Sequence, residues 1–145
     1  MIFKKKDIVK EKLLELGYNI IPSNSNAFNY AIENEKYAIL IKVVPFYLGN
    51  ELIVTNKHYW CINSDYKNYN RSKKPVLVKG VKEFDNVTYN TNKNVIKLGI
   101  ITPGCYNKTM YINECDVIKI SINTNCYGFK IITIDELEAL LDLYK

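Results

Sequence analysis

The run from Tyr37 to Val44 constrains the fold of this chain more than any other segment. It is made of aliphatic and β-branched residues after the tyrosine, and a single charge, Lys42, interrupts it. Such a run, with turn-forming residues on both sides, is typical of a strand buried on both faces at the centre of a mixed or parallel sheet. A charge in a central strand is costly to bury unless it is paired, so the position of Lys42 needs an explanation.

The segments before this strand predict a helix, an extended piece and a hairpin. A helix is expected over residues 7–16, with Asp7 as its N-cap and Gly17 as its left-handed stop. A short extended piece then ends at Pro22. Alternating apolar and polar residues over 28–33 predict a half-buried strand that turns back into the central one.

The segments after the central strand alternate in type. We expect, in chain order, a hairpin at 52–54 and 59–62, a helix over 75–89, a strand over 95–102, a short helix over 108–113, strands over 117–122 and 130–134, and a last helix that Asp135 caps. With no internal repeat and no linker, the chain predicts one α/β domain over residues 1–145, a mixed β-sheet flanked by helices. Residues 46–74 are interpreted as a hairpin and loop insertion in that domain.

The charge balance permits a polyanionic partner without requiring one. The formal net charge is +5 over 145 residues and the sequence pI is about 8.9, which bears on association and not on fold. No apolar signal-peptide core follows the lysines at residues 4–6, and no run reaches the roughly 20 apolar residues of a membrane span. We therefore expect a cytoplasmic protein without membrane contact.

The cysteines give no sign of a disulfide framework or of a metal site. Cys61, Cys105, Cys115 and Cys126 form no C-x-x-C pair. His58 and Cys61 have the spacing of half a zinc site, but no second pair completes it, and structural zinc normally takes four ligands. We expect reduced thiols, no bound metal and no cofactor.

A polar stretch from Asp65 to Lys74 interleaves basic residues with tyrosines. This composition suits a loop that follows a phosphate backbone and stacks on bases. The candidate nucleic-acid-binding residues are Lys42 from the central strand and, from this stretch, Lys67, Tyr69, Arg71, Lys73 and Lys74. A surface loop without a ligand would have the same composition, so both interpretations stay open.

Several segments, taken in chain order, carry a resemblance to a known superfamily. They are Leu16-Gly17-Tyr18 at the end of the first helix, Ile39 to Val44 in the central strand, Leu98 to Gly104 with its Thr-Pro-Gly turn, and Gly128 to Ile132 followed by Asp135 to Leu141. Their types and order resemble the Mrr-type branch of the PD-(D/E)xK restriction endonuclease-like superfamily. The resemblance covers most of the chain apart from residues 46–74, and it implies a restriction endonuclease-like fold.

The resemblance also implies where a nuclease site would lie. The superfamily places an acid on the first hairpin strand, an acid or glutamine on the central strand, and a lysine two residues later. The acids hold Mg²⁺, and the lysine assists the attacking hydroxide. These positions fall at Asn29, Lys42 and Val44. An amide, an ammonium and an isopropyl group cannot replace them, so the resemblance implies a degenerate site without catalytic residues.

The charge of Lys42 has two interpretations on this mapping. Its ammonium can bind phosphate through charge alone, where the superfamily uses a metal. Alternatively, it reaches water at the strand end or pairs with Glu33 across the hairpin.

Three functions from different classes remain open. The first is a non-catalytic nucleic-acid-binding module of nuclease-like fold, with DNA as the favoured ligand. The second is a protein-interaction or scaffolding subunit of a defence or phage system, in which residues 46–74 contact a protein partner or a second copy of the chain. The third is a nuclease with relocated acids, drawn from Glu33, Glu35, Glu51 or Asp65, and only this one requires Mg²⁺. The sequence favours a protein that is not an enzyme.

Overall fold

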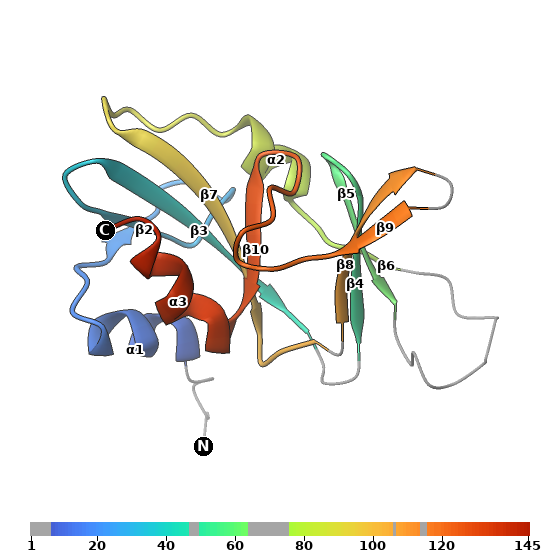
Figure 1. The fold of residues 1–145 in the computed structure, drawn as a ribbon. Helices are drawn as coiled ribbons and strands as arrows, with labels where there is room; N and C mark the ends of the chain where they lie inside the picture. Colours follow the sequence, from blue (N-terminus) through green and yellow to red (C-terminus); the bar gives the residue numbers. More distant parts are fainter. Residues whose placement is uncertain (1–6, 47–49, 64–75, 106, 114–115) are drawn as a thin grey trace, which may run out of the picture.

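The run from Tyr37 to Val44 is the central strand of a five-stranded sheet, as its composition predicts. The computed structural model gives this sheet the order β1-β2-β3-β7-β10, with β3 (Tyr37–Pro45) in the middle (Figure 1). β3 pairs antiparallel with β2 (Tyr30–Glu33), which pairs antiparallel with β1 (Ile21–Pro22). On its other side β3 runs parallel to β7 (Asn94–Thr102), and β7 runs parallel to β10 (Phe129–Thr133). The sheet is therefore mixed.

A second mixed sheet, of order β6-β5-β4-β8-β9, lies beside the first, and the expectation of a single sheet was wrong. Its strands are β4 (Glu51–Asn56), β5 (Tyr59–Asn63), β6 (Val76–Leu77), β8 (Asn107–Asn113) and β9 (Asp116–Lys119). The hairpin β4–β5 was predicted, but β4 also pairs in parallel with β8 from much later in the chain. The protein is one α/β domain with two mixed sheets flanked by a few helices.

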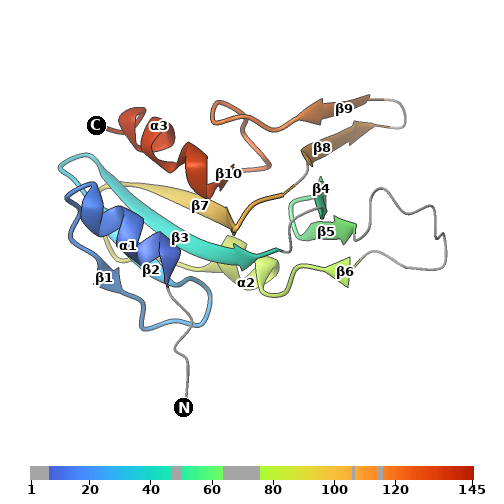
Figure 2. The same cartoon turned by 90° about the horizontal axis from the view of Figure 1, so that it is seen from below.

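One face of the first sheet is covered by the two ends of the chain (Figure 2). α1 (Ile8–Glu15) begins at Asp7, whose Oδ1 accepts a hydrogen bond from the Lys10 backbone N–H at 3.0 Å, and the chain leaves it through Gly17 at φ 87°. α3 (Leu137–Asp142) follows the short helix η1 (Ile134–Glu136) directly after β10. Their apolar side chains bury the sheet residues that point to this side, which include Ile39, Ile41, Leu98, Ile100 and Ile132.

The opposite face of the first sheet packs against α2 (Val81–Asn86) and the second sheet. Trp60, Phe84 and Phe129 are the largest fully buried side chains there. The Trp60 and Phe129 rings meet edge to face at 5.1 Å, and the Phe84 and Phe129 rings stack at 5.5 Å. Two cores thus lie on the two sides of β3 and β7.

Three predicted elements differ from the structure. The helix expected over 75–89 begins only after Gly80, whose φ is 83°, because β6 pairs with β5 before it. The helix expected over 108–113 is the strand β8, in which buried Lys108 and Met110 alternate with more exposed residues. Asp135 does not cap the last helix: Thr133 is the N-cap of η1, where its side chain and Glu136 form a capping box, and α3 follows η1 without a side-chain cap.

The structure describes residues 7–46, 50–63, 76–105, 107–113 and 116–145. Within these ranges, no helix has both the length and the apolar character needed to cross a membrane.

Candidate anion-binding groove

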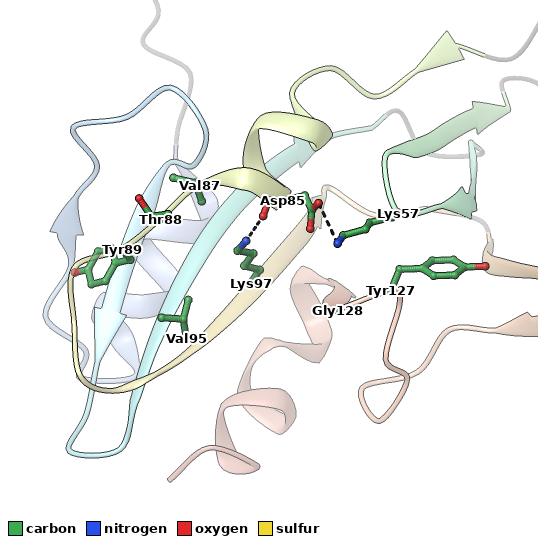
Figure 3. A pocket seen from close by; sticks show the side chains of 9 residues that line it. All are labelled: Lys57, Asp85, Val87, Thr88, Tyr89, Val95, Lys97, Tyr127 and Gly128. Carbon is green, nitrogen blue, oxygen red and sulfur yellow. Dashed lines mark hydrogen bonds and ion pairs between the residues drawn. The ribbon is translucent and has the colours of Figure 1, made fainter.

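An open groove of about 500 Å³ lies on the α2 side of the first sheet (Figure 3). Its walls come from four parts of the chain: the C-terminal part of α2 with the segment after it, β7, the turn of the β4–β5 hairpin, and the loop before β10. The polar side chains that line it include Lys57, Asp85, Tyr89, Lys97 and Tyr127.

Lys97 lies in the groove because the side chains of β7 alternate between the two faces of the sheet. In the sheet register Lys97 lies between Leu40 of β3 and Phe129 of β10, and both of these neighbours belong to the core on the α2 side. Residues side by side in a sheet point to the same face, so Lys97 points toward α2. Its Nζ donates a hydrogen bond to the backbone carbonyl of Asp85 at the C-terminal end of α2.

Three basic side chains converge on Asp85. The His58 Nε2 lies 2.9 Å from the Asp85 Oδ2, and the Lys57 Nζ lies 3.5 Å from the same oxygen. Lys57 and His58 form the tight turn between β4 and β5, where the Asn56 side chain accepts a hydrogen bond from the His58 backbone N–H at 2.9 Å. Asp85 therefore holds the β4–β5 turn and one lysine of β7 against the same helix end.

The protonation of this cluster is set by burial and by mutual charge. Burial alone would raise the pKa of Asp85, but the hydrogen bond from His58 and the charges of Lys57 and Lys97 outweigh it and lower that pKa. Burial lowers the pKa of Lys97, Asp85 opposes that shift, and Lys57 adds to it through like-charge repulsion. Lys57 and Lys97 both line the groove, and 59 % of the Lys57 side chain is exposed to solvent. Two ammonium groups on one open groove are suited to contact an anion such as phosphate.

Lys42 lies on the same face of the sheet, at the other end of α2. Its neighbours two residues away, Leu40 and Val44, belong to the core on the α2 side. Its Nζ is 3.1 Å from the position that a Cβ atom on Gly80 would occupy. Burial lowers the pKa of Lys42, and the nearby carboxylate of Glu83 partly opposes this.

The pairing of Lys42 with Glu33 that the sequence suggested does not occur. The β2–β3 register puts Glu33 opposite Ala38, and the Glu33 Oε2 lies 3.4 Å from the Lys93 Nζ. The other two positions implied by the nuclease resemblance flank Lys42. The Asn29 Oδ1 accepts a hydrogen bond from the Val43 backbone N–H at 2.7 Å, and Val44 is buried in the core.

The remaining predicted nucleic-acid-binding residues lie outside the described part of the chain. These are Lys67, Tyr69, Arg71, Lys73 and Lys74. The described chain resumes at β6, which leads to the exposed Lys79 and Lys82 on either side of Gly80.

The acids that could rebuild a nuclease site are dispersed. Glu33 lies in the first sheet and Glu51 is buried in the second, where burial raises the pKa of its carboxyl. Asp65 is outside the described ranges. Within those ranges no three histidine, cysteine or acidic residues gather closely enough to hold a metal ion.

The half zinc site suggested by His58 and Cys61 is not formed. His58 is engaged by Asp85, and the Cys61 Sγ lies 3.6 Å from the Thr55 Oγ1. Cys61, Cys105 and Cys126 are free thiols, and only Cys126 of these is fully buried. Burial raises the pKa of both Cys105 and Cys126 to about 11.

Sequence reasoning missed the cluster around Asp85, although one signal for it was present. Lys97 interrupts the apolar run of residues 95–102 as Lys42 interrupts that of the central strand. Two such interruptions in two adjacent buried strands indicate a charged site between them. The partners of Lys97 carry no such signal, because they come from a turn and a helix end.

The fold and the site thus define the structural class of this protein. It is a single α/β domain with two mixed sheets and a groove between them that basic side chains line. Comparison of the chain with models of protein families, with curated proteins and with solved structures finds no match.

Proposed function

We propose that this protein is a non-catalytic nucleic-acid-binding module, and that the groove beside Asp85 is its contact with phosphate. The observation that carries the proposal is the convergence of Lys57, His58 and Lys97 on one residue in an open groove. Phosphate contacts from lysine supply most of the sequence-independent affinity of proteins for nucleic acids.

The other end of α2 supports the same proposal. Lys42 lies against Gly80, and the exposed Lys79 and Lys82 stand on either side of Gly80 in the sequence. Cations thus occur at both ends of one short helix, while Glu83 offsets part of the charge near Lys42. A phosphate backbone crossing α2 would meet positive charge on both sides.

The chain order agrees with the nuclease-like fold that the sequence resembles: a helix, antiparallel strands leading into a central strand, and parallel strands after it. On that fold Asn29, Lys42 and Val44 stand where metal-binding acids and a lysine would be. The proposed module therefore retains the binding surface of such a nuclease and replaces its metal with the Lys42 ammonium.

The test is a titration of labelled DNA, single-stranded and duplex, at several salt concentrations with and without Mg²⁺. We expect affinity to fall steeply with salt and the DNA to remain intact. Lys57→Ala should lower the slope of log affinity against log salt by about 0.7 to 0.9, the effect of one lost phosphate contact. Lys10→Ala, an exposed lysine of α1 on the opposite face of the sheet, is the matched control and should leave the slope unchanged.

Three results would overturn the proposal. Affinity that does not change with salt would show that the protein makes no phosphate contacts. Equal effects of the Lys57 and Lys10 substitutions would show that the groove is not where such contacts are made. Cleavage that requires Mg²⁺ would instead show a nuclease.

A further inference from the structure

We propose that the outer edge of β9 binds the same edge of a second copy of this protein, so that their second sheets join into one. β9 is the last strand of the second sheet, and none of the described residues pairs with its outer side. Both ribbon views place it at the rim of that sheet, beyond β8 (Figure 1, Figure 2). The inference is independent of the proposed nucleic-acid binding, because none of the described residues that line the groove belongs to β9.

β9 leaves one apolar row of the second sheet unfinished. On the side of the sheet that packs against the first sheet, four neighbouring side chains lie side by side in the order Trp60, Val54, Met110 and Ile118. The first three are buried, while 38 % of Ile118 is exposed. Cross-strand apolar pairs stabilise a sheet, so an exposed isoleucine at the end of a buried row suits an apolar neighbour on an added strand.

The backbone of β9 shows which of its groups are available to an added strand. The Ile120 N–H donates a hydrogen bond to the Lys108 carbonyl of β8 at 2.9 Å. In an antiparallel pair, residues that bond to the neighbouring strand alternate with residues whose N–H and C=O groups point away from it. The pairing of β9 with β8 is regular from Val117 to Lys119. The backbone groups of Val117 and Lys119 therefore point to the free edge.

One register uses these free groups within β9 alone. When Ile118 lies opposite Ile118 of the second copy, Val117 of each copy lies opposite Lys119 of the other. These two residues can then exchange both of their backbone hydrogen bonds. The two Ile118 side chains meet at the two-fold axis and continue the apolar row from one copy into the next. The aliphatic stem of Lys119 covers Val117, which is 55 % exposed in the single chain.

The charges at the ends of β9 favour a second copy as the partner. The strand begins at Asp116 and ends at Lys119, and both residues are exposed. Antiparallel pairing places the acidic end of each copy beside the basic end of the other, whereas parallel pairing would bring like charges together. A charge on an edge strand normally discourages pairing with other chains. A strand of the same sequence, running in the opposite direction, supplies the compensating charges.

The test measures self-association by sedimentation at several protein concentrations, without nucleic acid. A contact between two strands of 4 residues is smaller than the roughly 1,200 Å² of a standard stable interface, so we expect a dimer that dissociates on dilution. Val117→Pro removes an outward N–H and no bond to β8, and should give a monomer. Ile118→Glu places two carboxylates opposite each other and should weaken association at least about tenfold. Urea unfolding of each variant checks that the fold is retained.

A charge exchange tests whether the partner is a second copy. Asp116→Lys gives a strand with two basic ends, and Lys119→Glu gives a strand with two acidic ends. Each variant alone should be monomeric, and a one-to-one mixture of the two should associate as the wild type does. Val76→Glu is the matched control, because Val76 is an exposed apolar residue of β6, at the opposite edge of the same sheet. It should leave association unchanged.

Three results would overturn the inference. The first is a wild-type protein that stays monomeric at every concentration. The second is a mixture of the two charge variants that does not associate. The third is an equal loss of association in Val76→Glu and Ile118→Glu, which would show that β6 of one copy pairs with β9 of the next. None of these results bears on the salt-dependent DNA affinity that tests the proposed function.

Discussion

Lys42 and Lys97 project from adjacent parallel strands onto the same face of the first sheet, one at each end of α2. Lys97 donates a hydrogen bond to the carbonyl of Asp85, where the partial negative charge of a helix C-terminus favours a cation. Lys42 lies beside Gly80 at the helix N-terminus, where a cation is disfavoured, and Glu83 supplies the nearby negative charge. The two lysines are therefore expected to differ in their effect on stability.

Replacing Lys42 should weaken binding without weakening the fold. The pKa of Lys42 in the folded protein lies below 10.5, so its charged form is disfavoured by folding, and its charge lowers stability at every pH below the folded pKa. The wild type should regain that stability as the pH rises toward 10.5. At neutral pH, Lys42→Met should leave the free energy of unfolding unchanged or raise it by up to about 1 kcal/mol, a small effect because the side chain is partly solvated.

Urea unfolding and DNA binding of the same Lys42→Met protein check this prediction together. Lys36→Met, in the exposed turn before β3, is the control and should change neither quantity. A clear loss of stability in Lys42→Met would show that the ammonium has a stabilising partner and is not held for ligand binding.

Asp85 should make the stability of the protein depend on pH in acid. Its folded pKa is lower than 3.8 because His58, Lys57 and Lys97 favour the carboxylate despite burial. Its contribution is therefore fully present above about pH 4 and is lost as the pH falls through the folded value. Asp85→Asn should be less stable than the wild type at pH 7 by about 1 to 3 kcal/mol. Between pH 7 and pH 3 the variant should lose less stability than the wild type, because it has no carboxylate to protonate at this position.

Urea midpoints measured from pH 7 to pH 3 test the role of Asp85. Asp142→Asn is the matched control, because this carboxylate is 56 % exposed and its ion pair with Lys145 is screened by water. Parallel pH profiles for the wild type and Asp85→Asn would contradict the role assigned to the cluster.

Gly99 should tolerate no side chain while Trp60 is present. A Cβ atom at Gly99 would lie 3.2 Å from two ring carbons of Trp60, which is fully buried and packed edge to face on Phe129. Gly99→Ala should therefore cost about 1 to 3 kcal/mol. Trp60→Phe creates space at this contact and sacrifices no hydrogen bond, since the Trp60 Nε1 has no partner among the described residues.

The Gly99 prediction is checked by a double-mutant cycle. Gly99→Ala should cost less in the Trp60→Phe background than in the wild type, by about 1 kcal/mol. Additive costs would show that the strand moves to accommodate the methyl group and that the ring is not the obstacle.

Removing either partner of the ion pair between Lys108 and Glu136 should lower the stability of the protein, and the two losses should differ. The Lys108 Nζ lies 3.0 Å from the Glu136 Oε1 and 2.7 Å from the Ile120 carbonyl, and only 9 % of its side chain is exposed, against 26 % for Glu136. Glu136→Ala leaves a buried ammonium without its counter-charge and removes the capping box with Thr133, so we expect a loss of about 2 to 4 kcal/mol. Lys108→Met leaves a carboxylate that reaches water and should cost about 1 to 2 kcal/mol.

Urea unfolding at low and high salt distinguishes this pair from a surface ion pair. Because Lys108 is buried, added salt should change the two losses little. Lys12→Met, whose ion pair with Glu15 is exposed, is the control and should cost less than about 0.5 kcal/mol. A smaller loss for Glu136→Ala than for Lys108→Met would reverse the predicted order.

The sequence predicted the elements of the first sheet well and those of the second poorly. β3, β7 and β10 are buried between two layers, so their apolar runs are continuous and easy to assign. β8 has polar residues at both ends, and its strand conformation depends on pairing with β4 and β9, which no local pattern reports. Tertiary contacts overrode the helical prediction there.

Of the residues of the candidate site, only those in strands could be predicted from the sequence. Lys42 and Lys97 could be recognised because a charge in a buried strand is costly. His58 and Asp85 could not be connected from sequence, since they come together only when the β4–β5 turn packs against the end of α2. Tyr127 carried no signal, because its left-handed conformation depends on the loop between the two sheets.

The order of the strands along the chain has a consequence for the protein's synthesis. β4, β5 and β6 precede β7, while β8 and β9 lie between β7 and β10, so each sheet is begun before the other is complete. As the polypeptide leaves the ribosome, β4 cannot pair with β8 until β8 has been synthesised, and β7 cannot pair with β10 until β10 has been synthesised. Neither layer can be excised as an autonomous unit, and a nascent chain that stops short of β10 has both of its cores open.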